Sequence, residues 1–441
     1  MEISELYDIY KACGGQVATD SRTLRGGELF FALKGENFDG NQYALKALEA
    51  GAAWAVVDEA VGIAGDRVIP VPDTLETLKA LARHHREHFR VGGERLTVIG
   101  LTGTNGKTTT KELIRSVLFV KYTVTATEGN LNNDIGVPLS LLKIREGTEL
   151  AVIEMGANHP DDILHLVEVA EPDFGLITNV GKAHLLGFGS LEGVKKAKGQ
   201  LYDYVAEHGR AVFLNADDPV LSEMAAARSL SVIPYGIETW GAMVLPSDAD
   251  HPFLRMAIPS EEAPDTLLGL ETHLAGSYNA ANVLAAIAVG RHFGVSLDEA
   301  MQAVASYVPA NSRSQMLRTE RNTVIMDAYN ANPTSMAAAL DNFSTVDAPQ
   351  KMALLGDMRE LGADSVEEHV AIIRRLGMQP ACLVGEEFRK ALERTGTPET
   401  VRWFATSADL AGWLRQEPLQ DMMILVKGSR GIRMETVVPE L

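Results

Sequence analysis

The side chains with the clearest chemistry lie in a glycine-rich run at residues 100–110. It reads Gly-Leu-Thr-Gly-Thr-Asn-Gly-Lys-Thr-Thr-Thr, follows an apolar stretch typical of a strand, and precedes a helical pattern at residues 111–118. Glycines let backbone amides approach phosphate oxygens, a helix N-terminus adds partial positive charge, Lys107 adds a full one, and the Thr108 hydroxyl can ligate Mg²⁺. The residues predicted to bind a nucleotide triphosphate are Gly103, Thr104, Asn105, Gly106, Lys107, Thr108 and Thr109. Because Leu101 stands where the strict phosphate-loop pattern has glycine, the loop is a variant.

Two further side chains are candidates for holding magnesium beside this loop. Glu154 ends an apolar run at residues 150–153, and His184 follows another at residues 174–178. Both then lie at the carboxyl edge of a parallel sheet, where ligands of open α/β folds bind, and hard cations prefer oxygen ligands. A lone loop histidine is more often solvated or hydrogen-bonded than a ligand, so the residues alone do not decide the role of His184.

The elements that must position these side chains fall into three stretches of the chain. Residues 1–94 alternate short apolar runs with helical patterns and predict a small α/β domain, which ends at the glycine break of residues 91–94. Residues 95–310 predict a central domain with a mostly parallel sheet and the phosphate loop. Within them, the Pro-rich acidic segment 246–265 predicts a surface excursion or irregular strands. Residues 311–441 predict a Rossmann-like, doubly wound domain whose first strand is at 324–326.

Composition and charge restrict the class of protein further. The 441 residues, 46% hydrophobic and 22% charged, are typical of a globular protein with about two to four domains. A net charge of −19 opposes binding to nucleic acid or to an anionic membrane surface. Cys13 and Cys382 form no metal or disulfide pattern, the N-terminus is acidic, and no apolar stretch is long enough to span a bilayer. We therefore expect a cytoplasmic protein without membrane insertion.

Seven blocks taken together resemble the Mur ligases, the ATP-dependent amide ligases of peptidoglycan precursor synthesis. In chain order they are residues 102–111, 129–138, 154–159, 178–184, 327–333, 355–362 and 427–430. The resemblance covers essentially the whole chain. The last three blocks are similar to the member that adds D-alanyl-D-alanine, and the sequence lacks the Asp-Asn-Pro-Arg motif of the diaminopimelate-adding members. The resemblance therefore implies a ligase that joins UDP-MurNAc-tripeptide to D-Ala-D-Ala.

The resemblance also implies a mechanism and a set of catalytic residues. ATP phosphorylates the terminal carboxylate of the muramoyl peptide, an amine attacks the acyl phosphate, and ADP and phosphate leave. Lys107, Lys198 and His184 are the implied catalytic residues, with two Mg²⁺ sites. Thr108 and Glu154 are implied to hold one ion and His184 the other, bridged by Lys198 after it takes up CO₂ as a carbamate. Gln200 replaces the glutamate usual near that lysine, which leaves the role of this neighbour open.

Further residues are implied to bind the nucleotide and the substrates. Asn279 and Asn282, three apart on one helix face, resemble the asparagines on the adenine side, and the alternative is helix capping or packing among alanines. Arg313 resembles the arginine that reaches the γ-phosphate, and Asp327 the residue that binds the ribose. The implied substrate-binding residues are Ser21, Arg22, Gly35, Asp39, Asn132, Asn133, Asn330 and Asn332. The dipeptide acceptor is expected at the loops 357–362 and 427–430.

Two rival functions stay open at this stage. One is a different amide ligase of the same build, either a sister Mur enzyme that adds a single amino acid or a folylpolyglutamate synthase. The other is a phosphate-loop NTPase that acts as a switch and makes no amide. Acceptor preference distinguishes the first rival, and ATP hydrolysis without muramoyl peptide distinguishes the second. We also expect a monomer that closes about a hinge near residues 309–313.

Overall fold

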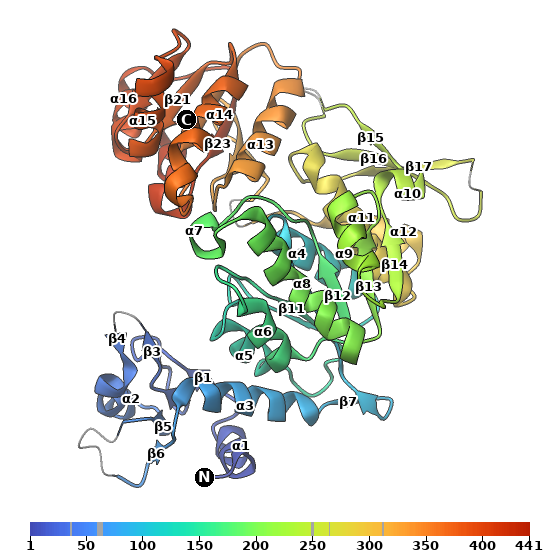
Figure 1. The fold of residues 1–441 in the computed structure, drawn as a ribbon, viewed down its shortest axis with the longest axis vertical. Helices are drawn as coiled ribbons and strands as arrows, with labels where there is room; N and C mark the ends of the chain where they lie inside the picture. Colours follow the sequence, from blue (N-terminus) through green and yellow to red (C-terminus); the bar gives the residue numbers. More distant parts are fainter. Residues whose placement is uncertain (36–37, 60–64, 248–250, 264, 311–312) are drawn as a thin grey trace.

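The chain folds into three α/β units that follow one another in sequence (Figure 1). The structure is a computed structural model and describes residues 1–441 except 36–37, 60–64, 248–250, 264 and 311–312. The N-terminal unit, in blue, and the C-terminal unit, in red, lie at opposite ends of the central unit. No helix within the described residues combines the length and the apolar character needed to cross a membrane.

The N-terminal unit has a four-stranded parallel sheet of order β1-β2-β5-β6. Its strands are β1 (Val17–Ala18), β2 (Leu29–Phe31), β5 (Trp54–Val57) and β6 (Val68–Pro70), and its helices are α1 (Ile3–Ala12), α2 (Ala44–Glu49) and α3 (Thr74–Glu87). A short hairpin of β3 (Lys34–Gly35) and β4 (Phe38–Asp39) carries two of the predicted substrate residues. The α3 helix starts where the Asp73 carboxylate accepts a hydrogen bond from the Glu76 amide.

The central unit has a six-stranded parallel sheet of order β10-β11-β9-β12-β13-β14. Its strands are β9 (Thr97–Thr102), β10 (Val124–Ala126), β11 (Leu150–Glu154), β12 (Phe174–Ile177), β13 (Ala211–Asn215) and β14 (Val232–Tyr235). Val98 and Ala151 pack into one core, whereas their neighbours Ile99 and Val152 pack into a second core. Alternate side chains thus enter the cores on opposite faces, so the strands are apolar throughout, as parallel strands covered on both faces must be.

Helices cover both faces of the central sheet. They are α4 (Lys107–Leu118), α5 (Gly136–Leu141), α6 (Asp162–Ala170), α7 (Leu185–Phe188), α8 (Leu191–His208), α9 (Pro219–Ala226), α10 (Ile237–Trp240), α11 (Ala280–His292) and α12 (Leu297–Ser306). The α4 helix packs chiefly on α11 and α12, and α8 packs on α6. These contacts place the helix that follows the phosphate loop against the helix that carries Asn282.

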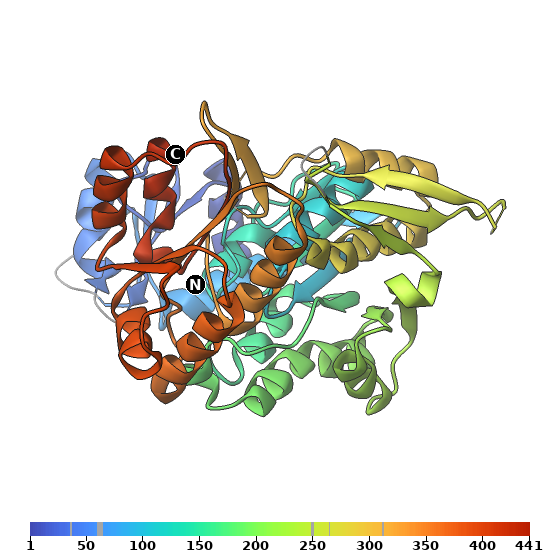
Figure 2. The same ribbon diagram turned by 90° about the horizontal axis from the view of Figure 1, so that it is seen from above.

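Within the Pro-rich segment predicted to be a surface excursion or irregular strands, residues 255–259 form the middle strand of a regular antiparallel sheet. Its strands are β15 (Met243–Leu245), β16 (Arg255–Pro259) and β17 (Leu267–Glu271), and the sheet extends from the side of the central unit (Figures 1 and 2). Met256 and Ile258 are buried while their neighbours along β16 are partly exposed, so one face of the sheet packs on the core. The alternation is only five residues long and lies between prolines and acidic residues, which hid it in the sequence.

The C-terminal unit has a six-stranded sheet of order β18-β19-β23-β20-β21-β22, parallel except for β18. Its strands are β18 (Gln315–Arg318), β19 (Thr323–Asp327), β20 (Lys351–Gly356), β21 (Ala381–Val384), β22 (Val401–Phe404) and β23 (Met423–Lys427), and its helices are α13 (Pro333–Thr345), α14 (Ser365–Leu376), α15 (Glu386–Thr395) and α16 (Ser407–Gln416). The prediction that the strand at 324–326 comes first is wrong. The antiparallel edge strand β18 precedes it, and its two apolar residues, between Gln315 and the exposed Arg318, are too few to give an apolar run.

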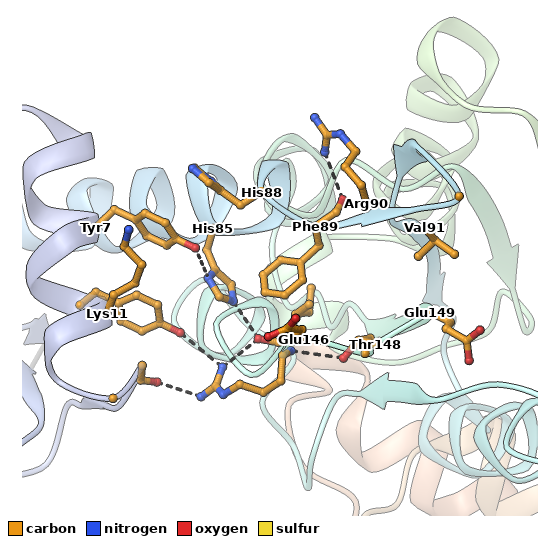
Figure 3. A pocket seen from close by; sticks show the side chains of 17 residues that line it. Tyr7, Lys11, His85, His88, Phe89, Arg90, Val91, Glu146, Thr148 and Glu149 are labelled. Carbon is orange, nitrogen blue, oxygen red and sulfur yellow. Dashed lines mark hydrogen bonds between the residues drawn. The ribbon is translucent and has the colours of Figure 1, made fainter.

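A joint of polar contacts connects the N-terminal unit to the central unit. The buried Arg86 guanidinium donates to Glu171 at 3.2 Å and to Asp173 at 3.1 Å. His85 lies between the Tyr7 hydroxyl, 3.2 Å from Nδ1, and the Ile144 carbonyl, 2.9 Å from Nε2 (Figure 3). A pocket of about 810 Å³ opens beside this joint. It is lined in part by the segment that precedes β11, at the amino edge of the central sheet and opposite the phosphate loop.

Candidate nucleotide and metal site

The predicted phosphate loop connects β9 to α4. Gly106 precedes the helix with a φ of +79°, and a Cβ there would lie 2.7 Å from the Asn282 Oδ1, so both the backbone and the space require glycine. The Lys107 ammonium turns back to the carbonyls of Gly103, at 2.7 Å, and Thr104, at 3.3 Å. Burial lowers the pKa of Lys107, and Arg313 lowers it further while Glu154 raises it. The loop therefore lies among charges contributed by two units of the chain.

A carboxylate and two polar side chains meet beside the first turn of α4. Glu154, at the carboxyl end of β11, accepts hydrogen bonds at Oε1 from Thr108, at 3.3 Å, and from Asn132, at 2.7 Å. Its Oε2 is buried without a hydrogen-bond partner in the part of the chain that the structure describes. An orphaned anionic oxygen next to a hydroxyl fits a bound cation, because Mg²⁺ commonly uses one or two carboxylates together with phosphate oxygens and water.

Lys198 lies on α8 and is 3% exposed. Burial holds its pKa well below the ordinary value, and the charge of Lys107 lowers it further. His184 directly precedes α7 in a left-handed conformation, with φ at +50°, and its Nδ1 pairs with Glu360 of the C-terminal unit. Burial lowers the pKa of His184, Glu360 raises it, and Lys107 and Lys198 lower it. The three predicted catalytic side chains are therefore electrostatic neighbours.

Asn279 and Asn282 lie side by side behind the phosphate loop. Asn282 Nδ2 donates to Asn279 Oδ1 at 3.0 Å, and Thr110 Oγ1 donates to Asn282 Oδ1 at 3.0 Å. Asn279 Nδ2 donates to the Ser314 hydroxyl at 3.1 Å. The pair thus connects α4 and α11 to the start of the C-terminal unit. Such contacts are also expected if the two asparagines serve only in helix packing.

Arg313 and Asp327 approach the site from the C-terminal unit. The Arg313 guanidinium carbon lies 3.6 Å from the ring centroid of Tyr329, and Nε of Arg313 is buried without a hydrogen-bond partner among the described residues. Asp327 accepts from the Lys427 ammonium at 2.5 Å and from the Ser314 amide at 3.3 Å. Asp327 therefore lies at the carboxyl end of β19 with its charge already paired.

The predicted substrate residues divide between two places. Asn132 contacts Glu154, Asn133 Oδ1 accepts from the Gly136 amide at 2.9 Å, and Asn330 Oδ1 accepts from the next amide. Asn332 contacts the phosphate loop. The other four residues, Ser21, Arg22, Gly35 and Asp39, lie in the N-terminal unit, in and before the β3–β4 hairpin.

In the N-terminal unit, the contacts of the predicted substrate residues are those expected of two ordinary polar turns. Arg22 is exposed and forms an ion pair with Asp20 at 2.7 Å. Asp39 accepts from the Asn41 amide at 3.0 Å and so caps the turn at Gly40–Tyr43. Gly35 pairs with Phe38, and a Cβ on Gly35 would lie 2.4 Å from the Phe38 ring. The structure does not bring these residues to the phosphate loop, so a ligand that uses both must be long.

Three contact residues at the site were not singled out individually by the sequence reasoning. Asn179 accepts from the Asn105 amide at 3.0 Å, Tyr329 stacks on Arg313, and Glu360 pairs with His184. Asn179 stands directly after a predicted strand, and this position could have marked it as a residue at the ligand-binding edge of the sheet. The other two lie beyond residue 310, and nothing in the local sequence shows which distant loop they contact.

The central unit carries a variant phosphate loop on a parallel sheet, and the Rossmann-like C-terminal unit contacts that loop. This combination is typical of a class of three-domain ATP-dependent enzymes. Family models describe three parts of this chain: the Mur ligase family catalytic domain matches residues 15–86, the Mur ligase middle domain 101–290, and the Mur ligase glutamate ligase domain 312–430. The chain belongs to the Mur ligase family and is an ATP-dependent ligase. This confirms the family resemblance and the three-domain α/β architecture, whereas the boundaries at 94 and 310 stay a prediction.

Proteins that are similar in sequence or in structure match almost the whole chain. The UDP-N-acetylmuramoyl-tripeptide–D-alanyl-D-alanine ligase of Bacillus subtilis is 34% identical and matches 96% of this chain and 92% of its own length. A crystal structure of MurF from Acinetobacter baumannii has a TM-score of 0.84 at 30% identity and covers 98% of this chain and 97% of that one. MurF from Thermotoga maritima, solved in complex with ADP, has a TM-score of 0.83 at 27% identity, with 96% of each chain covered.

Proposed function

We propose that this enzyme joins D-alanyl-D-alanine to UDP-MurNAc-tripeptide and converts ATP to ADP and phosphate. The observation that carries the proposal is the match along 96% of this chain to a ligase named for this reaction. The blocks at 327–333, 355–362 and 427–430, which resemble the D-Ala-D-Ala-adding member, support the same acceptor. The product is a peptidoglycan precursor.

The nucleotide is bound at the phosphate loop and at the start of the C-terminal unit. The backbone from Gly103 to Gly106 binds phosphate oxygens, and Lys107 leaves its two carbonyl partners to neutralise the β and γ groups. Arg313 approaches the γ-phosphate. Asn279 and Asn282 border the adenine, and Asp327 binds the ribose.

Glu154 and Thr108 hold one magnesium ion, and His184 contributes to a second site. The unpartnered Oε2 of Glu154 supports the first assignment. When bound, the two ions supply positive charge to phosphate oxygens as the muramoyl carboxylate is activated. Asn132, which donates to Oε1, holds the carboxylate in place.

Lys198 carries a carbamate formed with CO₂ and so becomes an anionic oxygen ligand. Carbamate formation needs a neutral amine, and burial beside Lys107 holds the pKa of Lys198 well below its ordinary value. A proton on the unmodified amine would place a second positive charge beside Lys107, so the amine is held in its neutral form. Uptake of CO₂ releases a proton and leaves a negative charge, which Lys107 attracts.

The muramoyl substrate extends from the N-terminal unit to the phosphate loop. Ser21, Arg22, Gly35 and Asp39 bind its UDP end, and Asn132 and Asn133 approach its peptide. Asn330 and the loops 357–362 and 427–430 face the dipeptide acceptor. The enzyme acts as a monomer in the cytoplasm.

The deciding experiment measures ADP release with UDP-MurNAc-tripeptide and each of four acceptors. We expect turnover with D-Ala-D-Ala and only background turnover with D-Ala, lysine or diaminopimelate. Turnover with a single amino acid but not with the dipeptide identifies a sister ligase and refutes the proposed acceptor. Equal ATP hydrolysis with and without muramoyl peptide identifies an NTPase switch. Lysine- and diaminopimelate-containing tripeptides, assayed separately, show which third residue is accepted.

A further inference from the structure

Asn332 contacts two different units of the chain through the two ends of its side-chain amide. Its Oδ1 accepts from the Ser335 amide at 2.8 Å and so caps the N-terminus of α13. Its Nδ2 donates to the Oδ1 of Asn105 in the phosphate loop, also at 2.8 Å. The second contact crosses between the C-terminal and central units, over 227 residues of sequence.

The main chain of Asn105 is already held by the segment that follows β12. Its amide donates to the Asn179 Oδ1 at 3.0 Å, and its carbonyl accepts from the Thr178 hydroxyl at 2.6 Å and from Asn179 Nδ2 at 3.0 Å. Both backbone groups of Asn105 are therefore used within the central unit. Its side-chain oxygen is the atom that contacts the C-terminal unit.

The first turn of α13 packs tightly against the same part of the central unit. The Lys182 amide donates to the Thr334 hydroxyl at 3.1 Å, and a Cβ on Gly181 would lie 2.8 Å from that hydroxyl oxygen. The Thr104 hydroxyl donates to the Gly181 carbonyl at 3.2 Å, which extends the connection back to the phosphate loop. Asn332 thus lies beside a close contact between the first turn of α13 and the segment that holds the phosphate loop.

We propose that Asn332 is a positioning residue that couples docking of the C-terminal unit to the shape of the phosphate loop. Its bond to Asn105 holds the apex of the loop while Lys107 exchanges two loop carbonyls for phosphate oxygens. This inference rests on the proposed use of ATP as a substrate. Because binding and docking are linked, nucleotide bound at the loop stabilises the docked C-terminal unit by the same factor.

Asn332→Ser separates the two contacts of this side chain. Serine is a favoured N-cap and keeps an oxygen for the Ser335 amide, but its shorter side chain does not reach Asn105. Asn342→Ser is the matched control. Asn342 has the same residue type and lies on α13, the helix that Asn332 caps. It accepts across the same interface from the Ser277 amide at 2.9 Å, and no hydrogen bond links its side chain to the phosphate loop among the described residues.

The experiment compares the KM values for ATP, muramoyl peptide and dipeptide, and the binding of a fluorescent ATP analogue without the other substrates. For Asn332→Ser we expect the KM for ATP and the Kd of the analogue to rise about fivefold, the effect of one lost hydrogen bond. The other two KM values stay unchanged, and any fall in the unfolding temperature is no larger than that of Asn342→Ser, which also loses one hydrogen bond between the units. Asn342→Ser alters neither the three KM values nor the Kd of the analogue.

A double variant tests whether the bond itself carries the effect. Asn105→Ala removes the same contact from the other side, so combining it with Asn332→Ser adds little to either single change. Fully additive losses, an unchanged affinity for ATP, or an equal loss in Asn342→Ser each overturn the inference. Analogue binding needs no acceptor, so it tests the inference even if wild-type enzyme rejects D-Ala-D-Ala, a result that refutes only the proposed acceptor.

Discussion

Acidification is expected to loosen the joint between the N-terminal and central units through His85. This side chain is 4% exposed, and burial lowers its pKa to about 4. The hydrogen bond to Ile144 opposes this shift, whereas Arg145 and the neighbouring histidines add to it. Its Nε2 faces the Ile144 carbonyl and must donate, so Nδ1 accepts from the Tyr7 hydroxyl. The folded protein therefore holds a neutral imidazole with one defined tautomer.

The size of the effect follows from the difference between the folded and unfolded pKa values. As the pH falls, the unfolded chain takes up a proton near 6.5, whereas the folded protein resists protonation until about 4. The free energy of unfolding therefore decreases across this window, at most by 1.36 kcal/mol per pH unit. Between about pH 7.5 and about pH 5 the loss due to His85 is about 2 kcal/mol, or about thirtyfold in the unfolding equilibrium.

Hydrogen exchange of the α3 amides measures this loss locally, which avoids assuming that three units unfold together. We compare wild type with His85→Gln, which is uncharged at both pH values and keeps an amide that can donate to the Ile144 carbonyl. Protection of α3, corrected for intrinsic exchange, should fall about thirtyfold more in wild type than in the variant. Equal losses in the two proteins, or a His85 ring that titrates near pH 6.5, would refute the reasoning.

Three further predictions concern charged side chains. Glu154→Gln keeps the shape of the side chain but removes its charge, and should lower kcat for ADP release about a hundredfold without lowering the unfolding temperature; an unchanged kcat contradicts its role at the metal. Lys198→Ala should abolish turnover, and depletion of CO₂ should slow the wild type until bicarbonate is restored; a fully active variant removes the carbamate. Arg86→Met leaves Asp173 facing Arg95 at 3.8 Å and should destabilise the protein by about 3 kcal/mol in thermal or urea unfolding; an unchanged midpoint shows that Arg95 compensates.

The fold was predictable where the chain is apolar and continuous. The buried runs at 150–153 and 381–384 became β11 and β21, because strands covered on both faces have few polar positions. Strands at the edges of sheets and short strands were less predictable. The β18 strand lies at the sheet edge with partly exposed residues, and β16 shows its alternation over only five positions. Their register depends on the neighbouring strand, which a local pattern does not contain.

The candidate site was predictable where its residues are adjacent in sequence. The loop from Gly103 to Thr109 can be recognised in the sequence because glycine, lysine and threonine must occupy consecutive positions between a strand and a helix. Lys198 carried no such signal, since a lysine in a helix with other lysines has the pattern of an exposed face. Its burial and its proximity to Lys107 are products of helix packing, and only the family resemblance pointed to it beforehand.

The contacts between units follow from one property of parallel sheets. Asn105 and His184 follow the carboxyl ends of β9 and β12, and their partners Asn332 and Glu360 follow the carboxyl ends of β19 and β20. Two sheets thus meet through the loops at their carboxyl edges, where open α/β folds bind ligands. A nucleotide at this junction contacts both units, so its binding energy can be used to close them. We therefore expect crosslinks between the central and C-terminal units to form faster with nucleotide and muramoyl peptide than without them, and equal rates would contradict this coupling.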